Sequence, residues 1–276
     1  MKLATLVVNG AMSAARIEGD QAVLIYGFPD VGAVLRQNAL EHAARAEGLR
    51  VAFDPLETLP VVVRPEKILC VGMNYRQHIQ EMGREMPSYP TLFPKWSQAL
   101  IGAGDPIMLP PESVQVDWEG ELALVVGHRV RRASVDQAWG AIAGFTIMND
   151  ISMRDWQYRT PQWLQGKSWE HSTPLGPVLV TPDELSDAAR LTTAINGQVV
   201  QSAQVSDLLF GPAELVAYIS TIMTLEPGDV IATGTPGGVG HARRPPVYLQ
   251  HGERVTVQIE GIGELSNLVL RDGTEY

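Results

Sequence analysis

Short apolar runs separated by Gly, Pro, Asn or Asp recur along the whole chain, and this pattern predicts many strands and few helices. We expect strands at residues 3–8, 14–25, 67–72, 116–126, 141–148 and 192–203, with more between residues 247 and 271. Turns at Gly19 and at Asn196-Gly197 divide two of these ranges. Apolar residues at helical spacing predict helices at residues 31–48 and 213–223.

Residues 1–60 form a small opening unit in this pattern, with strands, one helix and no recognisable chemistry. The proline-containing segment 56–65 is typical of a linker. We therefore expect an N-terminal appendage at residues 1–60 and a main domain at residues 61–276, since a chain of 276 residues can bury a substantial core.

Two acidic residues share one face of the strand expected at residues 116–126. Side chains alternate between the faces of a strand, so Glu119 and Glu121 point one way while Trp118 and Leu122 point the other. Like charges repel each other and lose hydration on an otherwise apolar strand, so this pairing indicates a shared cation. A solvated strand face is the alternative interpretation.

A third carboxylate follows the strand expected at residues 141–148, where Asp150 comes after Asn149. An aspartate at a strand end often forms a turn or caps a helix, and the alternative is a side chain aimed at the same point as Glu119 and Glu121. Three carboxylates without a nearby His or Cys ligand would select Mg²⁺, Mn²⁺ or Ca²⁺ over zinc.

The segment from residue 74 to residue 83 predicts a short helix that carries an acid–base pair. If Asn74 caps this helix, His78 and Glu81 lie three residues apart on one side, and the carboxylate can orient the imidazole. Histidine is suited to removing a proton near neutral pH, although an exposed helix with an incidental pair is the alternative. The following Gly-, Met- and Pro-containing loop indicates a lid.

Two loops contain further polar candidates. Lys167 lies in a segment punctuated by Gly and Pro, where it is either a surface lysine or a cation beside an anionic intermediate. The glycine-rich segment 233–240 lacks the spacing of a nucleotide-binding fingerprint, but its backbone N–H groups and Thr235 can hold a carboxylate. A tight structural turn is the alternative for this second loop.

Composition and charge exclude several classes of protein. The net charge of −10 argues against general binding to nucleic acid, whose protein partners cluster Lys and Arg. No apolar run approaches the roughly 18 to 20 residues that cross a bilayer, and the first run ends at Asn9-Gly10, too early for a signal peptide. The single cysteine, Cys70, lies in an apolar strand and predicts a buried, unreactive thiol. We therefore expect a cytoplasmic protein that binds neither nucleic acid nor membranes.

Six segments in this order resemble the fumarylacetoacetate hydrolase family, whose metal-dependent members act on acylpyruvates and related 2-oxo acids. They read N-Y-x-x-H-x-x-E at 74–81, D-W-E-G-E-L at 117–122, N-D-I-S-x-R-D-x-Q at 149–157, G-K-S at 166–168, P-L-G-P at 174–177 and P-G-D-V-I-A-T-G-T-P at 227–236. The resemblance covers about residues 67–270. It implies an α+β fold, with a mixed β-sheet rolled into a barrel-like body, a small N-terminal α+β appendage and a homodimer.

The resemblance also implies roles for individual residues. The implied metal ligands, for Mg²⁺ or Mn²⁺, are Glu119, Glu121 and Asp150. The implied catalytic residues are His78, Glu81 and Lys167. The implied substrate contacts are Thr235 and Gln157, and Tyr75 and Arg84 are further candidates for substrate binding. Arg84, in the expected lid loop, is the residue we expect to meet a second substrate carboxylate.

The activity implied by these residues is hydrolysis of a carbon–carbon bond in an acylpyruvate such as fumarylpyruvate, an intermediate of aromatic catabolism, with release of pyruvate and a carboxylic acid. Such a reaction needs a cation that stabilises the enolate and a base that activates water. The alternative is a decarboxylase, isomerase or hydratase that acts on an oxaloacetate-like or unsaturated 2-oxo acid through the same enolate. A third hypothesis is a binding protein that keeps the fold without turnover.

Two departures from the family pattern concern the far end of the substrate. Trp96 follows Lys95 where many members have proline, and the sequence after Lys167 differs from the common Phe-Asp-Thr type. Trp156, Trp163 and Trp169 cluster in the sequence near the expected site. A bulky or aromatic-derived substrate tail is one interpretation of this composition, and core packing is the other.

Overall fold

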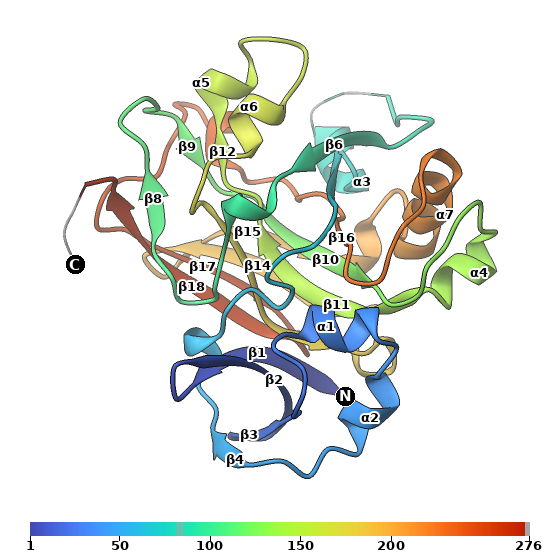
Figure 1. Cartoon of the computed structure of the whole chain (residues 1–276). Coiled ribbons are helices and arrows are strands. Elements are labelled where there is room, and N and C mark those ends of the chain that lie inside the picture. The colour runs from blue at the N-terminus through green and yellow to red at the C-terminus, as the bar shows by residue number, and fades with distance from the viewer. Residues whose placement is uncertain (82, 84, 274–276) are drawn as a thin grey trace.

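The computed structural model describes residues 1–81, 83 and 85–273, and its largest element is a mixed sheet of 11 strands (Figure 1). Along the sheet the order is β4 (Arg50–Ala52), β3 (Gln21–Leu24), β2 (Ala11–Glu18), β1 (Lys2–Val8), β13 (Thr173–Val180), β11 (Ile142–Asn149), β10 (Gly120–Val126), β16 (Val230–Ala232), β5 (Ile68–Gly72) and β6 (Thr91–Lys95). The short β7 (Leu100–Ile101) pairs with β13 in parallel. Strands far apart in the sequence therefore meet at the centre of this sheet.

Two smaller sheets complete the strand structure of the described residues. A five-stranded sheet has the order β15 (Gln198–Gln204), β14 (Arg190–Ile195), β17 (Arg254–Ile259), β18 (Gly263–Arg271) and β8 (Ile107–Leu109). A two-stranded sheet joins β12 (Ser152–Met153) to β9 (Val116–Asp117). Within the described ranges no pairing joins the two ends of a sheet, so the mixed-sheet prediction is confirmed and its barrel-like closure is not.

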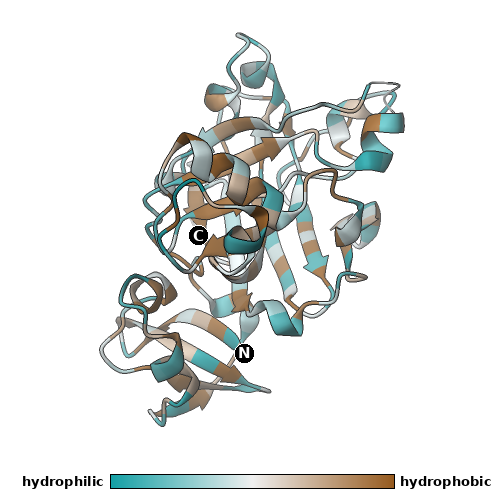
Figure 2. Ribbon diagram, turned by 90° about the vertical axis from the view of Figure 1, so that its right-hand side faces the viewer, coloured by the Kyte–Doolittle hydropathy of each residue, from teal (hydrophilic) through white to brown (hydrophobic). Residues whose placement is uncertain are grey.

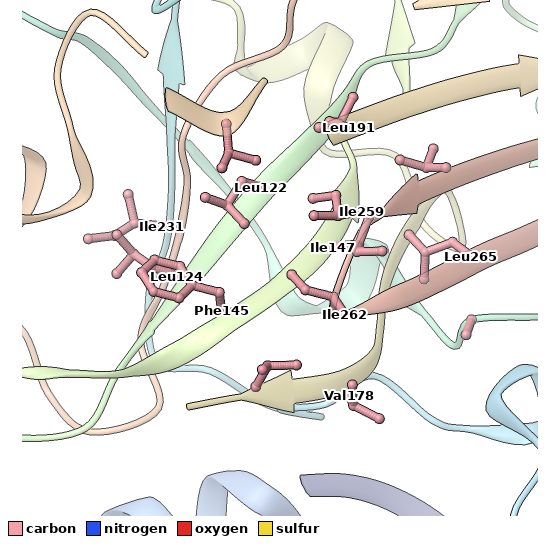
Figure 3. Packing of buried hydrophobic residues seen from close by; sticks show 14 of the residues in the cluster. Leu122, Leu124, Phe145, Ile147, Val178, Leu191, Ile231, Ile259, Ile262 and Leu265 are labelled. Atoms are coloured by element: carbon pink, nitrogen blue, oxygen red, sulfur yellow. The ribbon is translucent and has the colours of Figure 1, made fainter. Parts of the chain in front are cut away.

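The main apolar core lies between the two larger sheets. Figure 3 shows Leu122 and Phe145, from neighbouring strands of the large sheet, on the side that faces Ile259 and Leu265 of the smaller one. Their side chains are almost completely buried. This packing holds β10 and β11 rigidly side by side, and the functional residues lie where these two strands end.

Helices are short and peripheral. They are α1 (Val31–Arg36), α2 (Leu40–Ala44), α3 (Arg76–Glu81), α4 (Val135–Trp139), α5 (Arg154–Gln157), α6 (Leu164–Lys167) and α7 (Pro212–Ile222). Single 3₁₀ turns are found at Pro55–Glu57, Ser97–Ala99, Pro182–Glu184, Val205–Asp207 and Gly240–Ala242. The helix predicted at residues 213–223 is confirmed, within one residue at each end. The helix predicted at residues 31–48 is wrong in its length, because Asn38 adopts a left-handed backbone conformation (φ 52°) that ends α1 before α2 begins.

The strands of residues 1–60 continue the large sheet. The link is the antiparallel pairing of β1 with β13, at Lys2 with Val180 and Leu3 with Leu179. Figure 2 shows the lobe that these residues form at one end of the molecule, beside the N-terminus. The division of the chain at residue 60 stays a prediction. None of the described helices has the length and apolar character to cross a membrane.

Candidate functional site

Three buried carboxylates meet where β10 begins and β11 ends. Glu119, Glu121 and Asp150 each offer an oxygen, and these oxygens all lie within 4.8 Å of one another. The register of the two strands explains the meeting, because Gly120 pairs with Asn149 and the backbone N–H of Asp150 donates to the carbonyl oxygen of Glu119 (2.9 Å). The sequence expectation that Glu119 and Glu121 share a face is confirmed, although the expected strand is interrupted between β9 and β10.

Two buried lysines neutralise part of this cluster. Lys167 Nζ donates to Glu119 Oε2 (2.7 Å) and to Asp150 Oδ2 (2.8 Å), and Lys95 Nζ donates to Asp150 Oδ1 (2.6 Å). Burial alone would lower the pKa of Lys167, but Asp150 and Glu119 outweigh burial and raise that pKa above its usual value. Burial alone would raise the pKa of Asp150, and the two lysines reverse this effect and lower it. Both lysines are fully buried, so Lys167 is not the surface lysine of the alternative interpretation.

An arginine forms the third cationic contact with the cluster. Arg154, at the start of α5, pairs with Glu119 Oε1 (2.6 Å) and with Asp117 Oδ2 (2.8 Å), and it donates to Gln157 Oε1 (2.8 Å). Sequence reasoning singled out neither Lys95 nor Arg154 for a role. A lysine at the end of an otherwise apolar strand, and an arginine inside the segment 149–157, were the available signals.

Glu121 differs from the other two carboxylates because, among the described residues, no Lys or Arg pairs with it. Its Oε2 accepts a hydrogen bond from the backbone N–H of Gly234 (2.7 Å). Burial, and then the charges of Asp150 and Glu119, raise the pKa of Glu121 well above its usual value. Buried oxygen ligands with an incompletely neutralised carboxylate fit a hard divalent cation such as Mg²⁺ or Mn²⁺.

A cavity of about 450 Å³ opens onto this cluster. Its lining includes Glu119, Arg154, Lys167, Gln157, Thr235 and His78. Trp163 also lines it and packs edge-on against Phe93, with ring centroids 5.4 Å apart. A Cβ atom on Gly72 would lie 2.4 Å from the indole ring of Trp163, so a larger residue there would displace this ring. A larger cavity of about 730 Å³ lies between residues of the N-terminal lobe and β13, away from the carboxylates.

Two of the predicted substrate contacts line this cavity with polar groups that are already partly engaged. The hydroxyl of Thr235 donates to the carbonyl oxygen of Gly120 (2.9 Å) and accepts from Gln201 Nε2 (2.8 Å). Gln157 uses its Oε1 atom to accept from Arg154, and among the described residues its amide N–H groups have no hydrogen-bond partner, so they are available to a ligand. Both residues are therefore positioned by the protein before any ligand arrives.

The residues predicted on the lid segment are distributed differently. His78 borders the main cavity and also a second one of about 200 Å³, whereas Tyr75 borders only the second. The Tyr75 hydroxyl is buried and has no hydrogen-bond partner in the part of the chain that the structure describes; burial, followed by nearby Glu121, raises the pKa of Tyr75. The side chain of Glu81 and all of Arg84 lie outside the described residues.

Asn74 does not have the capping role that we predicted. Its side chain donates instead to the carbonyl oxygens of Phe210 (2.9 Å) and Thr233 (2.8 Å). Asp207 supplies the contact at the start of α3, by accepting from the backbone N–H of Gln77 (3.1 Å). Asn74 is fully buried, and its Oδ1 atom, which a helix cap would need, accepts from the backbone N–H of Phe210 (2.8 Å), so a residue from another loop stabilises the helix.

Comparison with known proteins extends this description. The family model described as "Fumarylacetoacetate (FAA) hydrolase C-terminal" matches residues 67–270. The chain is 41% identical over 240 residues to the mitochondrial oxaloacetate tautomerase Fahd2a of Rattus norvegicus, which covers 85% of this chain and 77% of the relative. The mitochondrial location of this relative contradicts our expectation of a cytoplasmic protein. That expectation rested on the absence of an export signal, and the fold carries no information about the compartment.

Two solved structures show the same fold over nearly the whole chain. The 5-carboxymethyl-2-hydroxymuconate delta-isomerase of Mycobacterium smegmatis is 34% identical with a TM-score of 0.82, and the match covers 99% of this chain and 100% of that one. The maleylpyruvate hydrolase of Sphingobium sp. SYK-6, solved with manganese(II) and pyruvate, is 26% identical with a TM-score of 0.78, over 98% and 99% of the two chains. This chain belongs to the fumarylacetoacetate hydrolase family of enzymes.

Proposed function

We propose that this protein catalyses the tautomerisation of an oxaloacetate-like 2-oxo acid with a bound divalent metal ion, Mg²⁺ or Mn²⁺. The observation that carries the proposal is the convergence of Glu119, Glu121 and Asp150, within 4.8 Å of one another, beside a cavity of about 450 Å³. The similarity to an oxaloacetate tautomerase supports this reaction in preference to our expectation of acylpyruvate hydrolysis.

The three carboxylates would hold the metal ion, and the manganese(II) of the similar maleylpyruvate hydrolase supports this assignment. A metal ion of this kind supplies Lewis-acid stabilisation of the negative charge that develops on a carbonyl oxygen during enolisation. Lys95 and Arg154 fix the orientation of Asp150 and Glu119, so little reorganisation is needed when ligand arrives.

Tautomerisation of a 2-oxo acid moves one proton between carbon 3 and the 2-oxo oxygen. Lys167 keeps its proton, because Asp150 and Glu119 raise the pKa of its ammonium group, and it offers positive charge to an oxyanion. His78 borders the cavity, and its imidazole is suited to accepting the carbon-bound proton and returning it. Gln157 and Thr235 would position the substrate carboxylate.

The test is conversion of enol-oxaloacetate to its keto form, followed as loss of the ultraviolet absorbance of the enol. We expect Mn²⁺-loaded protein to accelerate this loss well beyond Mn²⁺ alone, and we expect the isosteric change Glu121→Gln to remove most of the acceleration. His128→Gln, on the exposed surface, is the matched control. A rate no faster than that of Mn²⁺ alone would exclude the proposal.

Acylpyruvate hydrolysis is the second candidate, supported by the similarity to a maleylpyruvate hydrolase and by His78 at the cavity. His78, with Glu81 on the same helix, would take a proton from water, and the resulting hydroxide would attack the distal carbonyl. Chromatography of products from fumarylpyruvate distinguishes the two candidates, because hydrolysis yields fumarate and pyruvate. Release of CO₂ from oxaloacetate would instead indicate decarboxylation.

We also propose that the protein acts as a homodimer, as the family resemblance implies. Light scattering on the eluting peak of a sizing column measures the mass directly. A mass near twice 30.1 kDa is the expected result, and a mass near 30.1 kDa would contradict this proposal.

A further inference from the structure

A histidine that sequence reasoning did not single out lines the main cavity on its own short turn. His241 belongs to the 3₁₀ turn Gly240–Ala242, and the backbone N–H groups of Gly240 and His241 donate to Asp117 (2.7 and 2.9 Å). Asp117 is the carboxylate that also pairs with Arg154. The Asp117–Arg154 pair therefore connects the His241 turn to the carboxylate cluster.

One ring nitrogen of His241 is held and the other is free for a ligand. Nδ1 lies 3.0 Å from the hydroxyl oxygen of Tyr248, and the ring of Tyr158 packs beside it with centroids 5.2 Å apart. Within the described part of the chain Nε2 has no hydrogen-bond partner. When Tyr248 donates to Nδ1, the neutral ring carries its hydrogen on Nε2, and the protonated ring also donates from there.

The charges around His241 favour an anion. Glu119 is the one acidic residue in the described lining of the cavity, and Lys167 and Arg154 already pair with it. Burial, and then the positive charge of Arg154, lower the pKa of His241, while Asp117 opposes the shift. In the described lining of the cavity the two cations, Lys167 and Arg154, outnumber the one carboxylate, and this balance favours a bound anion.

We propose that His241, oriented by Tyr248, binds the carboxylate at the far end of a dicarboxylic 2-oxo acid, whose 2-oxo acid end lies at the carboxylate cluster. This inference rests on the proposed function and adds the residue that recognises the distal carboxylate, since a monocarboxylic 2-oxo acid has no group for this contact. Tyr248 is a positioning residue, and it acts by holding Nδ1.

Equilibrium binding to Mn²⁺-loaded protein tests the inference with two acids of equal carbon number. Calorimetry compares 2-oxoglutarate, which has a distal carboxylate, with 2-oxopentanoate, which has a methyl group there. We expect His241→Phe to weaken 2-oxoglutarate roughly tenfold or more and to leave 2-oxopentanoate within about twofold, because a hydrogen bond to a charged group is lost. His241→Gln, which keeps a donor, should recover most of the affinity.

The remaining variants separate a binding role from a structural one. Tyr248→Phe should weaken 2-oxoglutarate by a few-fold, and His128→Gln should change neither acid. With oxaloacetate as substrate, His241→Phe should raise KM and leave kcat within about threefold. If His241→Phe lost affinity for both acids equally, or lost affinity for neither, the inference would be overturned. Selective binding without tautomerase activity would instead overturn the proposed function and leave this inference standing.

Discussion

The two ends of the cavity are built in different ways. The charged floor consists of Glu119 and Lys167, which line the cavity, and of Glu121, Asp150 and Lys95, which cluster with them. It lies at the ends of paired strands and of one short helix and is buried. The rim of the cavity, which contains His78, His241 and Tyr158, comes from short helices and turns. Buried charges need partners, so the floor tolerates few changes, whereas the rim can vary in chemistry at little cost to folding.

This contrast suggests a division of labour. The floor would stabilise negative charge at the 2-oxo acid group that every substrate of the family shares. The rim would distinguish substrates by the part of the molecule at the other end from this group. Loops and turns at a rigid scaffold are where such specificity is usually found. Substitutions in the two regions should therefore differ in their effects on metal binding, stability and catalysis.

The largest expected effect comes from Asp150→Asn in the floor. It leaves Lys95 without its carboxylate partner and deprives Lys167 of one of two. We expect loss of Mn²⁺ binding and of tautomerase activity, together with a free energy of unfolding lower by about 3–5 kcal/mol. Urea unfolding and calorimetric titration measure these quantities, and unchanged Mn²⁺ affinity would refute the assignment of Asp150.

Lys95→Met should affect stability and metal binding in opposite senses. Asp150 keeps Lys167 as a partner, so we expect a loss of about 3 kcal/mol in the free energy of unfolding, at the lower end of the range for a broken buried pair. Because one positive charge beside the site is gone, Mn²⁺ should bind at least as tightly as in the original protein. Loss of Mn²⁺ binding in this variant would show that Lys95 affects the metal ion mainly by orienting Asp150 and not mainly through its own charge.

His78→Gln, at the rim, should separate catalysis from metal binding. Removal of a general base lowers a rate by about 100-fold or more, and we expect that loss in the conversion of enol-oxaloacetate. The free energy of unfolding and the Mn²⁺ affinity should stay unchanged. A variant with full activity would exclude His78 as the residue that carries the proton.

The smallest expected effect concerns the acid sensitivity of the rim. Burial and Arg154 hold the pKa of His241 below its ordinary value of 6.5, so between these two pKa values the unfolded chain binds a proton that the folded protein does not. The free energy of unfolding therefore falls as pH decreases through this window, and His241→Gln should make the fall less steep. Urea unfolding at several pH values, compared with His128→Gln, measures the difference in slope.

The sequence by itself determined the part of the site that depends on local geometry. Alternation along a strand predicted that Glu119 and Glu121 share a face, and they do converge although the strand is interrupted just before β10. The helix at residues 213–223 followed from its apolar spacing. The strands and the turns between them were predictable for the same reason, because their signals lie in neighbouring residues of the sequence. The family resemblance added the remaining functional residues, because six separated segments in one order carry more information than any one of them.

Only the tertiary structure decided which distant groups meet. Lys95 contacts Asp150 from 55 residues away, and Arg154 contacts Asp117 from 37 residues away. His241 reaches the same network across 124 residues, through Asp117. Periodicity reports on neighbours along the chain, whereas these contacts depend on strand register and on turns that bring separate segments together. The charge balance of the floor and the composition of the rim were therefore not predictable from the sequence pattern.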